Sequence, residues 1–170
     1  MESRAKLLGH PVHQQLIVFP LGLLATAVAF DLIAYIMNDS KWTGMAFYLI
    51  GAGILMGLTA AVFGAIDWLA IPNGTRAKRV GTVHGIGNVI VISLFSVSFV
   101  LRWSDPLNAG GVAYAFSYAG ALLSLLTGWL GGELVGRLGV GVDDGAHLDA
   151  PSSLSTRSAG PHRHRPMTEK

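Results

Sequence analysis

Four long apolar blocks, separated by short polar segments, dominate the chain. They cover about residues 16–37, 43–69, 80–101 and 112–135, and charged residues are almost absent from their interiors. None alternates as a half-buried strand would, and each reaches the roughly 20 residues that a helix needs to cross the hydrocarbon core of a bilayer. Because backbone polar groups must be satisfied internally in lipid, each block is predicted to be a helix.

The connections between the blocks are short and rich in residues that end helices. Residues 38–41, 71–74 and 105–111 contain Asn, Asp, Pro and Gly, which are typical of turns. Short connections join neighbouring antiparallel helices. We therefore predict an all-α fold, an integral membrane four-helix bundle with up-down topology.

The basic residues predict the orientation of this bundle. An even number of spans puts both termini and the second loop on one side of the membrane. That side then holds ten of the 12 Lys and Arg residues, and the other side holds Lys41 and Arg102. Lys and Arg are concentrated in cytoplasmic loops. We predict a multi-pass protein of the inner (plasma) membrane with both termini in the cytoplasm.

Composition narrows the function classes. The chain is 51% hydrophobic and 13% charged, and it has no cysteine. Cysteine catalysis, thiolate zinc sites and iron–sulfur clusters held by this chain are therefore excluded. The basic residues lie between and after the apolar blocks, not along one face, so nucleic acid is not an expected partner. Pro20 interrupts the first block, so we do not expect it to be a cleaved signal peptide.

The end of the chain differs in composition from the apolar blocks. Residues 143–170 are rich in Ser, Pro, Gly, Arg and His and show no apolar periodicity. Such a segment cannot bury enough apolar surface to fold. We predict a four-span domain over residues 1–142 and a disordered cytoplasmic tail over residues 143–170.

Small residues follow one face of the second block. The face consists of Gly53, Gly57, Ala60, Gly64 and Asp67. Lipid gives apolar helices no net drive to pair, so small residues mark the faces where they approach closely. We interpret this face as a helix-packing surface.

Polar and aromatic residues from all four spans reach the predicted cytoplasmic edge. They are His10 and His13 before the first span, Asp67 and Trp68 at the end of the second, His84 and Asn88 in the third, and Trp129 and Glu133 in the fourth. Ionisable groups at membrane depth usually face the bundle interior. The sequence therefore predicts one polar layer in the bundle.

Most members of this layer also have a purely structural explanation. Glu133 could pair with Arg137 four residues on. Asp67 could cap the basic loop that follows it, and the two tryptophans could belong to an interfacial belt. His84, in an otherwise uncharged span with Asn88 four residues on, is the hardest to explain in this way, although a hydrogen-bonded core histidine remains an equal alternative.

Asp31 lies deep in the first block, towards the predicted outer side. If its face of the helix points inward, the carboxyl group needs a partner in the bundle. The residues that we expect to supply one are Tyr35, Ser93, Ser96 and Ser124.

A series of motifs carries a family resemblance. The sequence contains GHPVH at residues 9–13, VFPLG at 18–22, GAIDW at 64–68, His84 with Asn88, and GWLGGELV at 128–135. Over residues 8–142 it resembles a bacterial family of predicted membrane proteins of unknown function with four spans. Gln14 departs from the proline that more often follows the second histidine there. The resemblance implies a redox neighbourhood, because related domains occur fused to Rieske-type iron–sulfur domains.

Three functions remain open. The first is a membrane anchor or scaffold in a redox system, without enzyme activity of its own. The second is a b-type haem protein that transfers electrons, with His84 and either His13 or His10 as axial ligands. In that case the glycine face of the second block would admit the haem ring. The haem propionates would be neutralised by Arg76, Lys78 or Arg79. The third is a small metal site built from His10, His13, His84 and Asp67 or Glu133. The expected partners are the lipid bilayer, a redox protein and a second copy of the chain.

Overall fold

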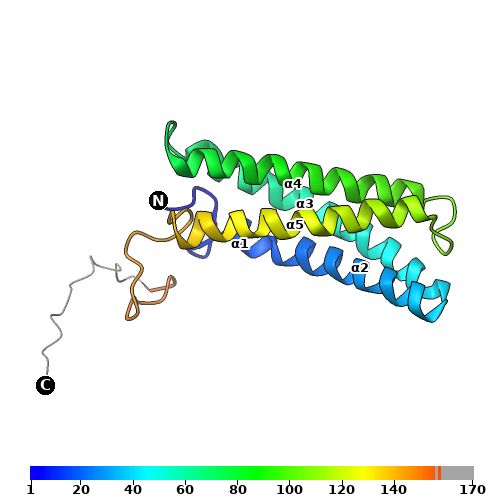
Figure 1. The fold of residues 1–170 in the computed structure, drawn as a ribbon. Helices are drawn as coiled ribbons and strands as arrows, with labels where there is room; N and C mark the ends of the chain where they lie inside the picture. The colour runs from blue at the N-terminus through cyan, green and yellow to red at the C-terminus, as the bar shows by residue number, and fades with distance from the viewer. Residues whose placement is uncertain (156, 158–170) are drawn as a thin grey trace, which may run out of the picture.

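Four long helices form the body of the molecule. The computed structural model describes residues 1–155 and 157, with long helices α2 (Val18–Met37), α3 (Ser40–Ala70), α4 (Arg76–Leu101) and α5 (Gly111–Gly136). In Figure 1, α5 lies in front, between α4 and α2, with α3 behind. Each of these helices is long and apolar enough to cross a membrane, and residues Val12–Met37, which include the short helix before α2, count as one span. The predicted all-α four-helix bundle is confirmed.

The four long helices run in alternating directions along the bundle. The turn from α2 to α3 and the loop from α4 to α5 lie at one end of the bundle, and the N-terminal segment and the loop from α3 to α4 lie at the other (Figure 1). Asp39 caps α3 by accepting a hydrogen bond from the Lys41 N–H, and Thr75 caps α4 through the Lys78 N–H. These caps start α3 and α4 at Ser40 and Arg76, before the apolar blocks begin, so both helices extend beyond the predicted spans.

The first span is interrupted near its start. A short helix, α1 (Val12–Leu16), ends at Ile17, and α2 begins at Val18. Pro20 has no N–H to donate to the carbonyl of Leu16, four residues earlier, which removes one bond from the helical ladder at this point. The break lets α1 take its own position against α3.

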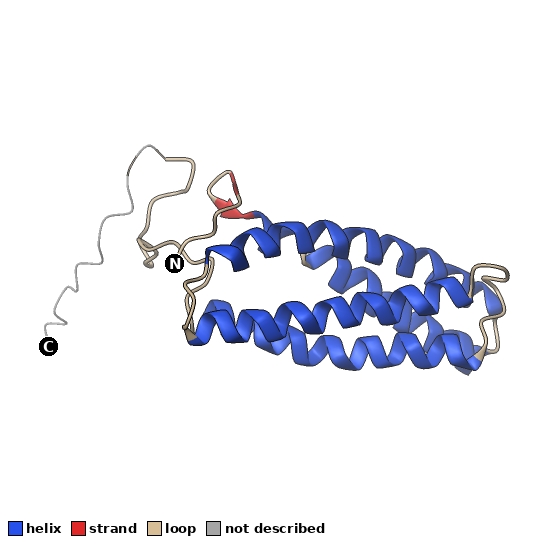
Figure 2. Cartoon of the chain, turned by 90° about the horizontal axis from the view of Figure 1, so that it is seen from above, coloured by secondary structure: helices blue, strands red, loops and turns tan. Residues whose placement is uncertain are grey.

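A small hairpin precedes α1. Strands β1 (Lys6–Leu7) and β2 (His10–Pro11) pair antiparallel, and Leu8 and Gly9 form the turn with φ of 52° and 84°. Gly9 adopts this conformation freely, whereas Leu8 is strained by it. Figure 2 shows the hairpin at one end of the bundle, where it leads directly into α1. Two-residue strands leave no periodic signal, so the sequence did not predict them.

The segment after α5 runs back over the hairpin. Residues 137–155 contain turns and bends but no helix or strand. The Ser153 hydroxyl donates to the carbonyl oxygen of Leu8, at the turn of the hairpin. The rest of the predicted disordered tail, residues 156 and 158–170, lies outside the described residues, and the disorder of the tail stays a prediction.

The centre of the bundle is closely packed around small residues. Its buried apolar cluster comprises Leu24, Ala27, Ala46, Ile50, Val91 and Phe95. A Cβ atom at Gly53 would lie 2.6 Å from Leu24 Cδ2, and one at Gly57 would lie 2.5 Å from Ile92 Cδ1. The small-residue face of α3 is therefore filled by side chains of α2 and α4, as its interpretation as a packing surface requires.

This close approach generates a test. Gly53→Ala should lower the free energy of unfolding by about 1–3 kcal/mol, because the added methyl group overpacks against Leu24. Unfolding of the detergent-solubilised protein measures the effect. Gly128→Ala in α5, where nothing lies within 4 Å of the new Cβ, is the matched control and should be close to neutral. Equal effects from both would contradict the packing account.

Candidate functional site

A buried ion pair joins the helices in the half of the bundle that includes the α2–α3 turn. Asp31 of α2 and Arg102, which follows the last residue of α4, are both completely buried. Arg102 Nη1 donates to Asp31 Oδ1 and Nη2 donates to Oδ2, each over 2.7 Å. This is the bidentate geometry in which a guanidinium binds a carboxylate most strongly.

Neighbouring side chains complete the surroundings of this pair. Arg102 Nε donates to Ser98 Oγ over 3.2 Å, and Ser117 Oγ of α5 donates to Asp31 Oδ2 over 3.3 Å. The Tyr114 ring lies 4.9 Å from the guanidinium carbon, close enough for a cation–π contact. The cluster therefore connects α2, α4 and α5 and leaves neither charge alone in the apolar interior.

A hydroxyl from another helix does bind Asp31, but it is that of Ser117, and no hydrogen bond joins Asp31 to Tyr35, Ser93, Ser96 or Ser124, which the sequence suggested. Tyr35 is 83% exposed, and the hydroxyls of Ser93 and Ser124 donate to carbonyls of their own helices. The sequence placed Arg102 in the outer loop because it follows the last apolar residue of its span. The structure instead turns its side chain back into the bundle, one helical turn from Ser98.

His84 belongs to a closed hydrogen-bond network between α4 and α5. Its Nδ1 lies 2.9 Å from the Thr127 carbonyl oxygen, which can only accept, so Nδ1 carries a proton. Asn88 Nδ2 donates to His84 Nε2 over 3.1 Å and to the His84 carbonyl over 2.9 Å. The Thr127 hydroxyl donates to Asn88 Oδ1 over 3.2 Å. Both ring nitrogens of a neutral His84 are therefore occupied.

His13 of α1 is held in a similar way, by a carbonyl oxygen of α3. Its Nδ1 lies 2.8 Å from the Ala60 carbonyl oxygen of α3 and donates to it. A Cβ atom at Gly64 would lie 2.8 Å from His13 Cε1, so the glycine makes room for the ring. His13 Nε2 has no hydrogen-bond partner among the described residues. His10 is exposed and lies 3.3 Å from Ser153 Oγ through its Nε2, away from these two rings.

Asp67 fixes the N-terminal segment to the end of α3. Its carboxylate accepts hydrogen bonds from the Ser3 hydroxyl at 2.7 and 2.8 Å, from the Arg4 N–H at 2.7 Å and from the Ala5 N–H at 3.4 Å. The suggestion that Asp67 caps the basic loop was therefore wrong. Ser3, which carried no sequence signal, is buried by this contact.

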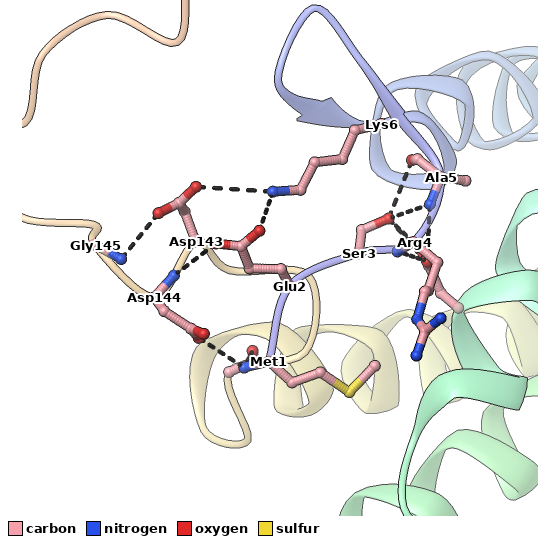
Figure 3. A network of polar contacts seen from close by, with 11 residues as sticks. Met1, Glu2, Ser3, Arg4, Ala5, Lys6, Asp143, Asp144 and Gly145 are labelled. Atoms are coloured by element: carbon pink, nitrogen blue, oxygen red, sulfur yellow. Dashed lines mark hydrogen bonds and ion pairs between the residues drawn. The ribbon is translucent and has the colours of Figure 1, made fainter. Parts of the chain in front are cut away.

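Charged groups extend this contact towards the segment after α5 (Figure 3). The Met1 amine donates to the Gly139 carbonyl over 3.1 Å and lies 3.4 Å from an Asp144 oxygen. Lys6 is hydrogen-bonded to Glu2 and lies 3.7 Å from Asp143. The hydrogen bond that Lys6 donates to Glu2 raises the pKa of Lys6, so Lys6 keeps its charge at neutral pH and on the basic side loses it only above the ordinary pKa of a lysine. We call residues 1–11 and 137–155 together the cap.

The remaining members of the predicted layer do not meet at one point. Glu133 pairs with Arg76 over 2.6 Å, not with Arg137 as suggested. Trp68 donates to Thr82 Oγ1 and carries Lys78 over its ring, whereas Trp129 is 67% exposed. In the part of the chain that the structure describes, no three His, Asp or Glu side chains lie close enough to hold a metal ion.

Fold and side chains together define a multi-pass membrane bundle with buried polar connections. Residues 9–144 match the family described as "Predicted membrane protein (DUF2231)". The chain belongs to this family of predicted membrane proteins, whose function is unknown. No curated protein and no solved structure matches it.

The buried ion pair generates a test of stability. Arg102→Leu should lower the free energy of unfolding by about 3–5 kcal/mol, because it leaves Asp31 buried without a countercharge. The double variant Asp31→Leu with Arg102→Met should recover most of that loss. Lys41→Gln, which removes a mostly exposed pair with Asp39, is the control and should be nearly silent. Denaturant unfolding in detergent measures all three, and a silent Arg102→Leu would refute the assignment.

Asp67 generates a second test, on the cap. Asp67→Leu should raise the rate of trypsin cleavage after Arg4 and Lys6 by at least about tenfold, because bonds to a charged acceptor that hold the segment are lost. Mass spectrometry of timed digests measures the rate. Asp105→Asn, which alters an exposed carboxylate in the α4–α5 loop, should leave it unchanged. An unchanged rate in Asp67→Leu would show that other contacts hold the segment.

Proposed function

We propose that this protein is a membrane anchor or scaffold. The observation that carries the proposal is that the polar atoms of three inward-facing side chains, Asp31, His84 and Asp67, already have partners within the chain. Asp31 is bound by Arg102, His84 by Thr127 and Asn88, and Asp67 by Ser3 and the backbone beside it. Among the described residues, Trp42 Nε1 is the one buried side-chain nitrogen or oxygen that lacks a hydrogen bond.

This pattern favours a structural role on physical grounds. A binding or catalytic site needs polar groups that are positioned but still available to the ligand. In lipid, apolar contact gives little net drive for helix association, so hydrogen bonds and ion pairs between helices hold a bundle together. The polar groups of this chain therefore fit a role in holding the helices together.

The cap is the part of the anchor that meets the aqueous phase. The distribution of basic residues supports a cytoplasmic cap and an inner-membrane location. Asp67 and the charged contacts around Met1 and Lys6 give this cap a fixed position on the bundle. We propose that the cap presents a surface to a membrane partner, with a redox protein and a second copy of the chain as the partners to examine first.

One observation favours a second function, a haem or metal ion held by histidine. Both His13 and His84 donate from Nδ1 to a backbone carbonyl. This contact orients ligating histidines and directs Nε2 towards the metal. His13 Nε2 would be the first ligand, and a bound haem would supply one-electron transfer.

The fit of this chain to haem is partial. His84 Nε2 already accepts from Asn88, so it could bind iron only after the amide turned away. The glycine face expected to admit the ring is filled by Leu24, Ile92 and His13. Arg76 is paired with Glu133, and Lys78 donates to the Trp68 carbonyl, so these two residues are not free to neutralise propionates. The scaffold therefore accounts for more of the contacts.

Thermal unfolding with and without added ligand separates the two functions. For a scaffold, neither haemin nor Zn²⁺ should raise the unfolding temperature of the detergent-purified protein. A bound ligand at 100 times its dissociation constant would add about 2.7 kcal/mol of stability. His84→Ala should lower stability equally with and without ligand, by about 1–3 kcal/mol, because Asn88 and the Thr127 carbonyl lose their partner.

The opposite result has an equally clear meaning. A haem-dependent rise in the unfolding temperature, with a Soret band that disappears in His13→Ala, would overturn the scaffold and establish the haem site. Thr59→Ala is the matched control, since its exposed hydroxyl bonds only the Leu55 carbonyl of its own helix. It should change neither spectrum nor stability.

A further inference from the structure

A shallow, mostly open cavity of about 340 Å³ lies where the N-terminal segment crosses the end of α3. It is lined by Arg4, Ile66, Leu69 and Ala70. Residues 66, 69 and 70 share one face of α3, because positions three and four apart in a helix are neighbours. Ile66 is 41% exposed and Leu69 is 70% exposed. The cavity thus combines an apolar wall with a single guanidinium group.

The Arg4 guanidinium has no partner among the described residues, although the backbone beneath it is fixed. The backbone N–H of Arg4 donates to Asp67 Oδ1 over 2.7 Å, which sets the position of the residue. The Asp67 carboxylate is taken up by that N–H, by Ser3 and by Ala5. In Figure 3 the Arg4 side chain extends away from the carboxylates of Glu2, Asp143 and Asp144, and no dashed line reaches its guanidinium group.

Several other cations at this end of the bundle are already engaged. Lys6 is paired with Glu2 and Asp143, and Arg76 with Glu133. Lys78 donates to the Trp68 carbonyl and lies 3.8 Å from the centre of its ring. Arg4 therefore presents an unpaired charge beside an apolar surface at the membrane boundary.

We propose that this cavity binds one anionic phospholipid of the leaflet on the side of the cap. The guanidinium would bind the phosphate of the headgroup, since its planar fork matches phosphate oxygens. An acyl chain would lie along Ile66 and Leu69. An anionic phospholipid then uses both the apolar wall and the guanidinium group.

The alternative ligands use less of the cavity. A free phosphate would use only the charge of Arg4, and a zwitterionic lipid would bring its phosphate to Arg4 without a net negative charge. Basic pockets on the cytoplasmic side of membrane bundles bind anionic headgroups in this manner. The proposal is independent of the proposed function.

The experiment titrates phosphatidylglycerol into the full-length protein in phosphatidylcholine nanodiscs and counts bound lipid by native mass spectrometry. Wild-type protein should retain phosphatidylglycerol in preference to phosphatidylcholine. Arg4→Gln should weaken this preference about fivefold, the factor expected for one basic residue near an anionic surface. The Arg4 N–H and its bond to Asp67 remain in this variant, so the cap should keep its position.

Two controls make the outcome decisive. Arg79→Gln removes the same charge from an exposed residue of α4 that does not line the cavity, and it should keep the wild-type preference. Inorganic phosphate at matched concentration should not displace the lipid. An equal loss in Arg79→Gln would reduce the effect to general surface charge and overturn the proposal. Full displacement by phosphate would overturn it as well, in favour of a site for a free anion.

Discussion

In a lipid environment, the polar groups of this chain must find their partners within the chain. Apolar side chains gain little by leaving lipid for the bundle interior, so the contacts that determine how the helices sit are the close-packed small residues and the polar connections. The Asp31–Arg102 pair is the strongest of these, because two full charges are buried and satisfied in bidentate geometry. The His84 network and the Asp67 contact apply the same rule nearer the cap.

The sequence predicted the fold almost completely because the length of an apolar block has one interpretation in a membrane. The family resemblance was also correct. The sequence predicted the polar partners poorly, because the partner of a side chain depends on where the chain turns in three dimensions. Asp31 could be recognised as needing a partner, but finding Arg102 required knowing that a residue at the end of a span turns back towards Ser98. The contact between Asp67 and Ser3 depends on an N-terminal segment whose path no periodicity records.

Different kinds of contact hold different parts of the molecule together. Where Asp31 meets Arg102, a compact cluster joins three helices by charge and hydroxyl groups. Across the middle, small residues and the histidine network set the spacing of the helices. The cap is attached by partly exposed ion pairs, which salt weakens more readily than buried contacts, and by the buried carboxylate of Asp67. The outer contacts of the cap are therefore the part of the structure that responds most to ionic strength, whereas the buried pair responds least.

The position of the buried pair in the chain has a consequence for biogenesis. Asp31 and Arg102 are 71 positions apart, so the aspartate leaves the ribosome well before its partner. On insertion scales an unpaired carboxylate costs about 2.5–3.5 kcal/mol at the centre of a spanning helix, which is an upper bound for Asp31 because it lies nearer the end of α2. We therefore expect the first helical hairpin to enter the bilayer with this carboxylate unpaired and the second hairpin to supply Arg102. On this expectation, the later half of the chain stabilises the membrane insertion of the earlier half.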